Sequence, residues 1–151
     1  MPRYFYAVSA VAGIVLAVGL FWHKTPPTLS AAQASLAEFG GVSFRLEYAT
    51  STVDQERGLG GRASIPSDYG MLFIFQKDSQ YGFWMKDMLT PIDIFWLDDK
   101  GQVIYISENV ATSTYPHVFY PSAPARYVLE TASGFAHAHS IATGTVLRLK
   151  N

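Results

Sequence analysis

Cysteine is absent from the 151-residue chain, which excludes a disulfide framework, a thiolate metal site and a lipid-modified cysteine anchor. Positive charge is also scarce, because from Gly40 onward nine Lys and Arg residues stand against eleven Asp and Glu residues. A nucleic-acid-binding domain needs a surplus of positive charge to hold the phosphate backbone, so we expect no nucleic-acid partner. The sequence also lacks a glycine-rich phosphate loop, a zinc-protease helix motif and a serine nucleophile elbow, which leaves the familiar enzyme classes unsupported.

Histidine gives little support for a metal site. His137 and His139 would share one face only in an extended segment, whereas residues 134–140 have the composition of a short helix. His117 is too distant in the sequence to be placed beside them. We therefore expect neither a bound metal nor a cofactor.

The residues at the start of the chain predict a membrane anchor. Tyr4 to Trp22 is a run of 19 residues without a charge, between Arg3 and His23-Lys24. As a helix it would span roughly 28 Å, close to the roughly 30 Å hydrocarbon core, whereas a cleavable signal has an apolar region of about 7–15 residues. Residues 1–24 are therefore predicted to form a single transmembrane helix.

A cleaved signal sequence is the alternative, since Ala32-Gln33-Ala34 has the small-x-small form of a cleavage site. Residues 25–39 are rich in Pro, Ser, Ala, Gln and Thr and predict a linker, with a globular domain at 40–151. We expect this domain on the extracytoplasmic side of the inner or cytoplasmic membrane, or secreted or periplasmic after cleavage. The flanking charges alone do not fix the orientation.

Hydrophobic periodicity predicts the elements of the domain. Alternating apolar and polar residues indicate a strand at Val42–Tyr48, and hydroxyl caps followed by acidic residues indicate a helix that ends between Arg57 and Gly61. The other predicted elements are strands at Tyr69–Phe75, Ile92–Leu97, Gln102–Ser107, Ala125–Thr131 and Val146–Leu149, a long loop at Glu108–Ser122 and a short helix at Gly134–Ser140.

Asp98–Gly101 is a strong turn signal that joins Ile92–Leu97 to Gln102–Ser107 as an antiparallel hairpin. The long apolar runs of both strands predict that the hairpin lies in the middle of the sheet. The expected fold class is α+β: a small, strongly curved, mainly antiparallel sheet, or a barrel-like fold, with one or two short helices.

Five ordered motifs carry a family resemblance. They are Glu56-Arg57-Gly58-Leu59 with Arg62, Gly70-Met71-Leu72-Phe73, Phe83-Trp84-Met85-Lys86, Pro91-Ile92-Asp93-Ile94, and Tyr127-Val128-Leu129-Glu130 followed by Gly134. From about Val42 to Leu149 the chain resembles the domain of unknown function 192 family, also called uncharacterised protein family 0127. The resemblance implies a compact β-rich domain, often behind an export signal, and brings no established activity. Asp87 stands where the family usually has asparagine, which places a negative charge beside Lys86.

Candidate site residues are those that interrupt apolar or glycine-rich runs. A buried carboxylate such as Asp93 or Glu130 needs partners, which are either structural ties or a ligand. Guanidinium groups beside a glycine-rich helix end can hold a carboxylate or phosphate or form ordinary salt bridges, and Trp84 can stack on a flat ligand or pack in the core. The candidate ligand-binding residues are Arg57, Arg62, Trp84, Lys86, Asp93 and Glu130. We expect all of them except Arg62 to converge around one partly open pocket.

These residues suggest a membrane-tethered module that binds a small ligand, a glycan or a protein. One alternative is an enzyme that uses Asp93, Glu130 and Lys86 for acid–base chemistry. Another is a structural or assembly component of the cell envelope, which would present a large exposed apolar patch.

Overall fold

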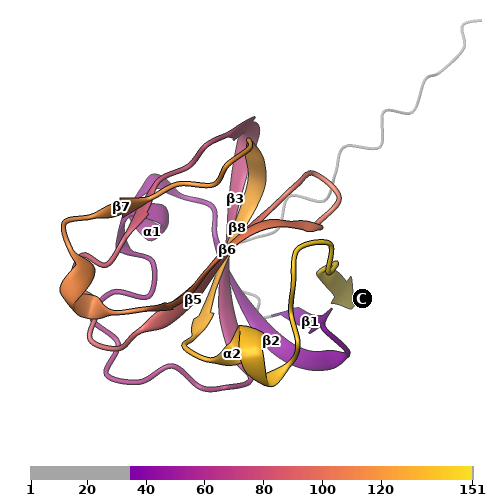
Figure 1. Cartoon of the computed structure of the whole chain (residues 1–151), viewed down its shortest axis with the longest axis horizontal. Helices are drawn as coiled ribbons and strands as arrows, with labels where there is room; N and C mark the ends of the chain where they lie inside the picture. The colour runs from indigo at the N-terminus through magenta and orange to yellow at the C-terminus, as the bar shows by residue number, and fades with distance from the viewer. Residues whose placement is uncertain (1–34, 151) are drawn as a thin grey trace, which may run out of the picture.

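The computed structural model describes residues 35–150. Seven strands form one sheet in the order β6-β5-β8-β3-β2-β1-β9, and β4 and β7 form a separate two-stranded sheet (Figure 1). In chain order the elements are β1 (Ser35–Phe39), β2 (Val42–Ala49), α1 (Thr52–Arg57), β3 (Tyr69–Ser79), β4 (Phe83–Trp84), β5 (Ile92–Leu97), β6 (Val103–Val110), the 3₁₀ turn η1 (Thr112–Thr114), β7 (Val118–Phe119), β8 (Ala125–Ala132), α2 (Phe135–Ala138) and β9 (Arg148–Lys150).

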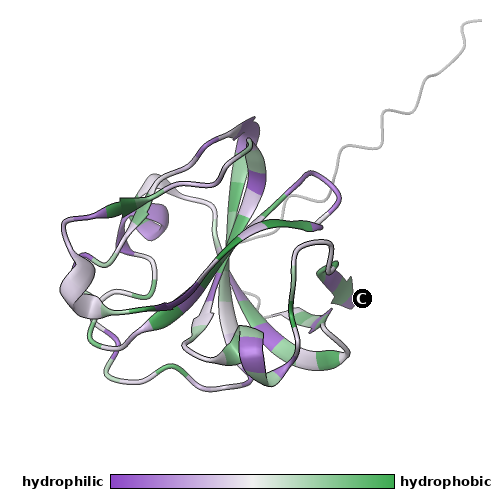
Figure 2. Ribbon diagram, viewed as in Figure 1, coloured by the Kyte–Doolittle hydropathy of each residue, from purple (hydrophilic) through white to green (hydrophobic). Residues whose placement is uncertain are grey.

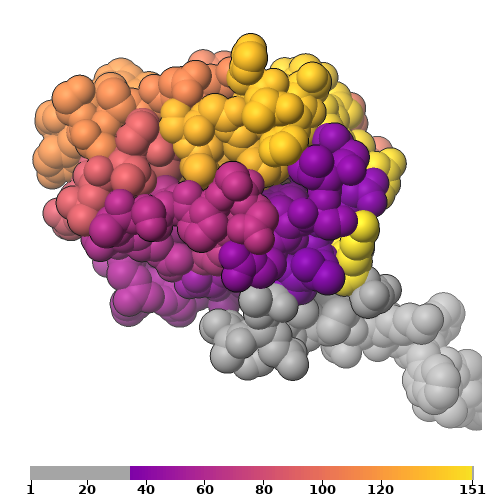
Figure 3. Space-filling view, turned by 90° about the horizontal axis from the view of Figure 1, so that it is seen from below, coloured from indigo at the N-terminus to yellow at the C-terminus, as the bar shows by residue number. Residues whose placement is uncertain are grey.

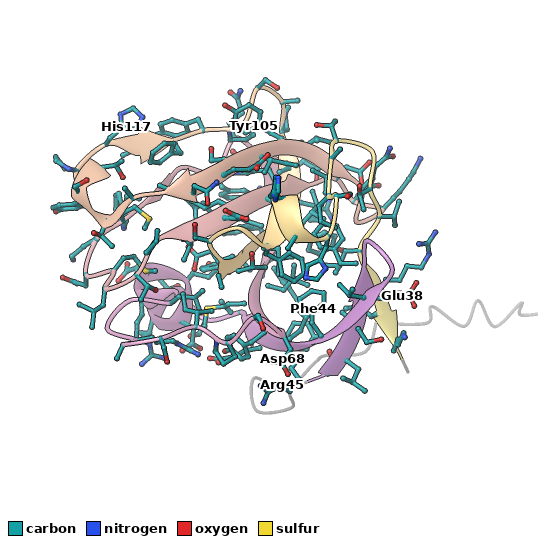
Figure 4. The ribbon with its side chains drawn as sticks, turned by 60° about the horizontal axis from the view of Figure 1, so that its bottom comes forward. Glu38, Phe44, Arg45, Asp68, Tyr105 and His117 are labelled. Carbon is teal, nitrogen blue, oxygen red and sulfur yellow. The ribbon has the colours of Figure 1, made fainter. Side chains whose placement is uncertain are left out.

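Neighbouring strands of the large sheet are antiparallel except for β2 and β3, which are parallel. A parallel pair needs a crossover connection, and α1 with the loop after it supplies one. The start of β3 is fixed beside β2 because Arg45 N donates to Asp68 O and their side chains form an ion pair of 3.1 Å; the two side chains lie together in Figure 4. The fold is thus mostly β-sheet with two short helices, as predicted.

Both faces of the sheet are covered. Because side chains alternate along each strand, β5 and β8 contribute to two separate apolar cores. One core lies on the side of α2 and includes Phe39, Phe44, Phe95, Leu129 and Phe135. The other lies on the side of α1, β4 and β7 and includes Met71, Phe73, Phe83, Ile94, Trp96 and Val128. Figure 1 shows α1 and β7 on one side of the sheet and α2 on the other, and Figure 2 shows the green apolar bands along the strands.

The sheet does not close, so the barrel-like alternative is wrong. β6 and β9 form its two edges, and β9 lies beside β1, where the yellow and indigo segments meet in Figure 3. Within residues 35–150, one isolated bridge, between Gln102 and Val146, and the backbone hydrogen bonds around it join the segments that lead into β6 and β9. One bridge does not make the continuous ladder that a closed barrel requires.

The hairpin of β5 and β6 is present and antiparallel, but its predicted place in the middle of the sheet is wrong. β5 is buried at all six positions, whereas β6 is the edge strand and leaves several side chains partly or fully exposed, including Tyr105. The apolar residues of β6 therefore pack this edge strand against the core, and they do not show that the strand lies inside the sheet. The two-stranded β4–β7 sheet was not predicted, and β7 lies within the predicted loop.

The domain begins earlier than predicted. Ser35–Phe39 lies in the predicted linker, but it forms β1, which pairs with β2 and β9 and buries Ala37 and Phe39. The predicted transmembrane helix, the alternative cleavage site and the rest of the linker lie outside the described residues. Within residues 35–150, every helix is too short or too polar to cross a membrane.

Candidate functional site

The site is built around Glu130, near the end of β8, an interior strand of the large sheet. Glu130 lies opposite Met71 of β3 and Ile94 of β5, so its side chain projects from the face covered by α1 and β4. Only 4% of the residue is exposed. Sheet pairing on both sides and the covering layer together explain this burial.

The Glu130 carboxyl group has little support from the protein around it. Leu59 N–H donates to Oε2 over 3.3 Å and is the only donor to this carboxyl among residues 35–150. In the same part of the chain, none of the ion pairs includes Glu130. Burial raises the pKa of Glu130 to about 7, although the Leu59 N–H and the positive charge of Arg62 act in the opposite direction. At neutral pH both the protonated and the ionised form of the Glu130 carboxyl are therefore populated.

A pocket of about 230 Å³ opens beside this carboxyl, between α1 and the segment that contains β4. Its lining residues are Thr52, Gln55, Glu56, Arg57, Gly58, Leu59, Phe75, Tyr81, Gly82, Phe83, Trp84, Lys86, Met88 and Glu130. Glu130 is buried, whereas Lys86 is exposed, Trp84 is 47% exposed and the Arg57 side chain is 60% exposed. Glu130 therefore lies at the inner end of the pocket, and the other three lie at its mouth.

Gly58 allows α1 to end against Glu130. Its φ of 52° and ψ of −136° belong to a region that residues with a Cβ rarely adopt. A Cβ at this position would also lie 3.1 Å from Glu130 Oε2 and 3.2 Å from the Phe73 ring. The absence of a side chain thus lets the backbone approach Glu130 and directs the Leu59 N–H to the carboxyl.

Aromatic side chains form the apolar wall. In β4, Phe83 points inward and packs edge-on against Phe73 and Trp96, while Trp84 points outward. Tyr81 stacks on Phe75, and Trp96 Nε1–H donates to Tyr81 O over 2.8 Å. These contacts within the protein hold the segment before β4 in place.

Arg62 does not line this pocket. It donates to Glu47 over 2.9 Å and to the Tyr69 hydroxyl over 2.7 Å, and Tyr69 also donates to Glu47. Partial burial raises the pKa of Glu47, but hydrogen bonds from Tyr69 and Arg62, with the charge of Arg62, outweigh it and lower the pKa. Arg62 thus belongs to a structural hydrogen-bond network. Of the two roles that its sequence pattern allows, it forms an ordinary salt bridge.

Asp93 is a structural tie on the opposite face of the sheet. It is fully buried, pairs with Thr131 across the strands, and accepts hydrogen bonds from Asn109 N, Gly134 N and Ala136 N at 2.8, 3.2 and 2.8 Å. These bonds connect β5 to the end of β6 and to the start of α2. The expected convergence of Asp93 with the other residues is therefore wrong.

The structure brings four of the six predicted residues to one pocket: Arg57, Trp84, Lys86 and Glu130. The sequence interpretation missed Leu59 as the partner of Glu130 and Gly58 as its close neighbour, although both belong to the Glu56–Leu59 motif. In residues 35–150, no three His, Asp or Glu side chains are grouped as metal ligands.

Comparison with known proteins gives a family and a fold. The model of the family DUF192 ("Uncharacterized ACR, COG1430") matches residues 35–149. No curated protein matches the chain. A protein from Sinorhizobium meliloti 1021, described as a "putative transcription regulator", is similar in structure, with a TM-score of 0.73, 24% identity and coverage of 80% of this chain and 97% of its own. A protein of unknown function from Novosphingobium aromaticivorans DSM 12444 has a TM-score of 0.68 and 25% identity, covering 75% of this chain and 83% of its own. The chain belongs to the DUF192 family.

Proposed function

We propose that the chain is a membrane-tethered extracytoplasmic domain that binds a small organic molecule in the pocket between α1 and β4. The observation that carries the binding proposal is the carboxyl of Glu130, which is buried at the inner end of the pocket with one backbone donor in the described structure. A buried carboxyl group with few hydrogen-bond donors is costly, and a ligand that donates to this carboxyl offsets that cost. Convergent polar groups in a pocket that also has apolar walls are typical of ligand sites.

The size and walls of the pocket favour a small ligand over a glycan chain or a protein. The pocket has a volume of about 230 Å³, and a hollow of about 410 Å³ adjoins it at Glu56, Arg57 and Lys86. These volumes suit a small molecule, since pockets that enclose drug-sized molecules have roughly 300–1,000 Å³. Phe75, Phe83 and Met88 offer apolar surface for the body of the ligand, and Trp84 at the mouth can stack on it.

The structure gives less support to an acid–base enzyme that uses Asp93, Glu130 and Lys86 than to a binding domain. Asp93 and Glu130 leave the sheet on opposite faces, so one substrate cannot contact both carboxyl groups. The description of the Sinorhizobium protein as a regulator gives no reason to propose nucleic-acid binding here, because the acidic residues outnumber the basic ones from Gly40 onward.

Membrane tethering is supported by the uncharged run Tyr4–Trp22, which has the length of a membrane-spanning helix. Carbonate extraction of cell membranes tests this part of the proposal. The intact chain should stay in the membrane pellet; its recovery as a soluble protein with residues 1–24 still attached would contradict tethering.

Protein-observed NMR of the full-length chain tests ligand binding. A library of small fragments with acidic, basic and neutral members should include compounds that shift the indole N–H signal of Trp84 saturably. The indole of Trp96 is an internal control, because it is buried and hydrogen-bonded to Tyr81 O. Leu89→Ala, which removes an exposed apolar side chain that is not among the pocket's lining residues, should leave the shifts unchanged. If no fragment shifts the Trp84 signal, the binding proposal fails.

A further inference from the structure

Two carboxyl groups share one face of the sheet, and they have very different surroundings. The strand register aligns Ile94, Glu130, Met71 and Glu47 in one row across β5, β8, β3 and β2. Glu47 is paired with Arg62 and the Tyr69 hydroxyl, whereas Glu130 has only the Leu59 N–H within residues 35–150. The fold therefore supplies a cation for one carboxyl of the row and leaves the other facing the pocket.

The mouth of the same pocket carries two cationic side chains, Arg57 and Lys86, and two exposed acidic side chains, Glu56 and Asp87, lie beside them. Arg57 uses one nitrogen for Asp54 at 2.8 Å and keeps its side chain 60% exposed. Lys86 forms no ion pair and no side-chain hydrogen bond with any residue between 35 and 150. Both cations also line the hollow that adjoins the pocket, together with Val53, Glu56, Gly60, Gly61 and Asp87. An anionic group at the mouth can thus reach two cationic side chains from two elements.

We propose that the ligand is a small amino-carboxylate, whose ammonium group binds Glu130 at the inner end while its carboxylate binds Lys86 and Arg57 at the mouth. This inference rests on the proposed ligand-binding function and adds the chemical class. An ammonium group has three donors and no acceptor, which suits a carboxylate with unfilled acceptor positions. The apolar body between the two charges then lies against Phe83 and Met88.

A dependence of affinity on pH follows from this arrangement. Burial holds the pKa of Glu130 near 7, and an ammonium ion binds the ionised form, so binding displaces a proton from the protonated fraction. Affinity should rise about tenfold from pH 6 to pH 8. The groups that face Glu130 are the uncharged Met71 and Ile94 on the adjacent strands, the charge of Arg62 after α1, and the pocket residues Glu56, Arg57, Tyr81 and Lys86.

The test uses the full-length chain and calorimetry with para-aminomethylbenzoate and with linear amino-carboxylates from β-alanine to ε-aminocaproate. Benzylamine and para-toluate are the matched probes for the aromatic compound, since each lacks one of its charges. At least one amino-carboxylate should bind, and loss of either charge should weaken binding tenfold or more. Glu130→Gln should abolish both the preference for the amine and the pH dependence. Glu108→Gln, an exposed carboxyl outside the pocket, is the control and should change affinity less than twofold.

The outcomes separate the ligand class from the pocket itself. If para-toluate or an uncharged fragment shifts Trp84 and binds as tightly as every amino-carboxylate, the ligand class is wrong and the binding pocket stands. The class also fails if affinity falls from pH 6 to pH 8, because that result assigns the protonated carboxyl as the binding form. If neither the amino-carboxylates nor the fragment library shifts Trp84, both proposals fail.

Discussion

Replacing Glu130 with glutamine isolates the energetic cost of the carboxyl group that β8 buries. The pKa of Glu130 is about 7 in the folded chain, against an ordinary value of 4.5. Between these two pH values the folded state binds more protons than the unfolded state, so the free energy of unfolding falls as the pH rises. Each pKa unit corresponds to about 1.4 kcal/mol, so the stability lost by pH 8 amounts to about 3 kcal/mol.

Glutamine has nearly the same shape as glutamate, and its carbonyl can accept the Leu59 N–H without carrying a charge. Glu130→Gln should therefore match the wild-type chain at pH 4 and exceed its stability by about 3 kcal/mol at pH 8. Urea denaturation of both full-length chains at pH 4, 6 and 8 measures this difference. The other ionisable groups are present in both chains and largely cancel in the comparison.

Glu108→Gln provides the control, because Glu108 is exposed and its replacement should change stability by less than about 0.5 kcal/mol at each pH. If the difference between wild type and Glu130→Gln stays constant from pH 4 to pH 8, the carboxyl does not titrate differently in the folded and unfolded chains. That result would refute the description of Glu130 as a buried, poorly partnered acid.

Three further substitutions test the rest of the site. Asp93→Ala should lower the free energy of unfolding by about 3–5 kcal/mol, because it leaves three backbone N–H groups without their acceptor. A loss below about 1 kcal/mol in chemical denaturation would contradict the structural role of Asp93. Trp84→Ala should cost only about 1 kcal/mol of stability, since the side chain is 47% exposed, but should weaken calorimetric binding of any pocket ligand about tenfold. Gly58→Ala should cost more stability in thermal unfolding than Gly41→Ala, because both glycines have positive φ but only at Gly58 does the new methyl meet the Glu130 carboxyl; equal losses would contradict that contact.

The strands were predictable where residue type alternates or where an apolar run is bounded by turn residues. β2 and the β5–β6 hairpin followed from these local patterns, since side chains of a strand point to the two faces in turn. The position of a strand within the sheet was not predictable in this way. β5 and β6 both contain several apolar residues, but contacts between segments distant in the sequence place β8 beside β5 and leave β6 at the edge.

In the candidate site, too, the local features were predictable from the sequence and the long-range contacts were not. A carboxyl that interrupts an apolar run is expected to be buried, and both Asp93 and Glu130 are. Their different roles depend on register, because Ile94 rather than Asp93 lies opposite Glu130, and a shift of one residue turns a side chain to the other face. The partner of Glu130, Leu59, is 71 residues away, and neither periodicity nor local spacing reports such a contact.

On the sheet face covered by α1 and β4, Glu130 is a buried carboxyl group without a cationic partner in residues 35–150. Carboxyl ¹³C NMR of the full-length chain tests this central claim most directly. Glu47, in the same row, is an internal reference because Arg62 and Tyr69 hold its pKa below 4.5. The Glu130 signal should titrate near pH 7 in the free chain and shift to lower pH when a saturating amino-carboxylate is added. A Glu130 signal that titrates near 4.5, with or without ligand, would contradict both its burial with a single backbone donor and its place at the inner end of a binding pocket.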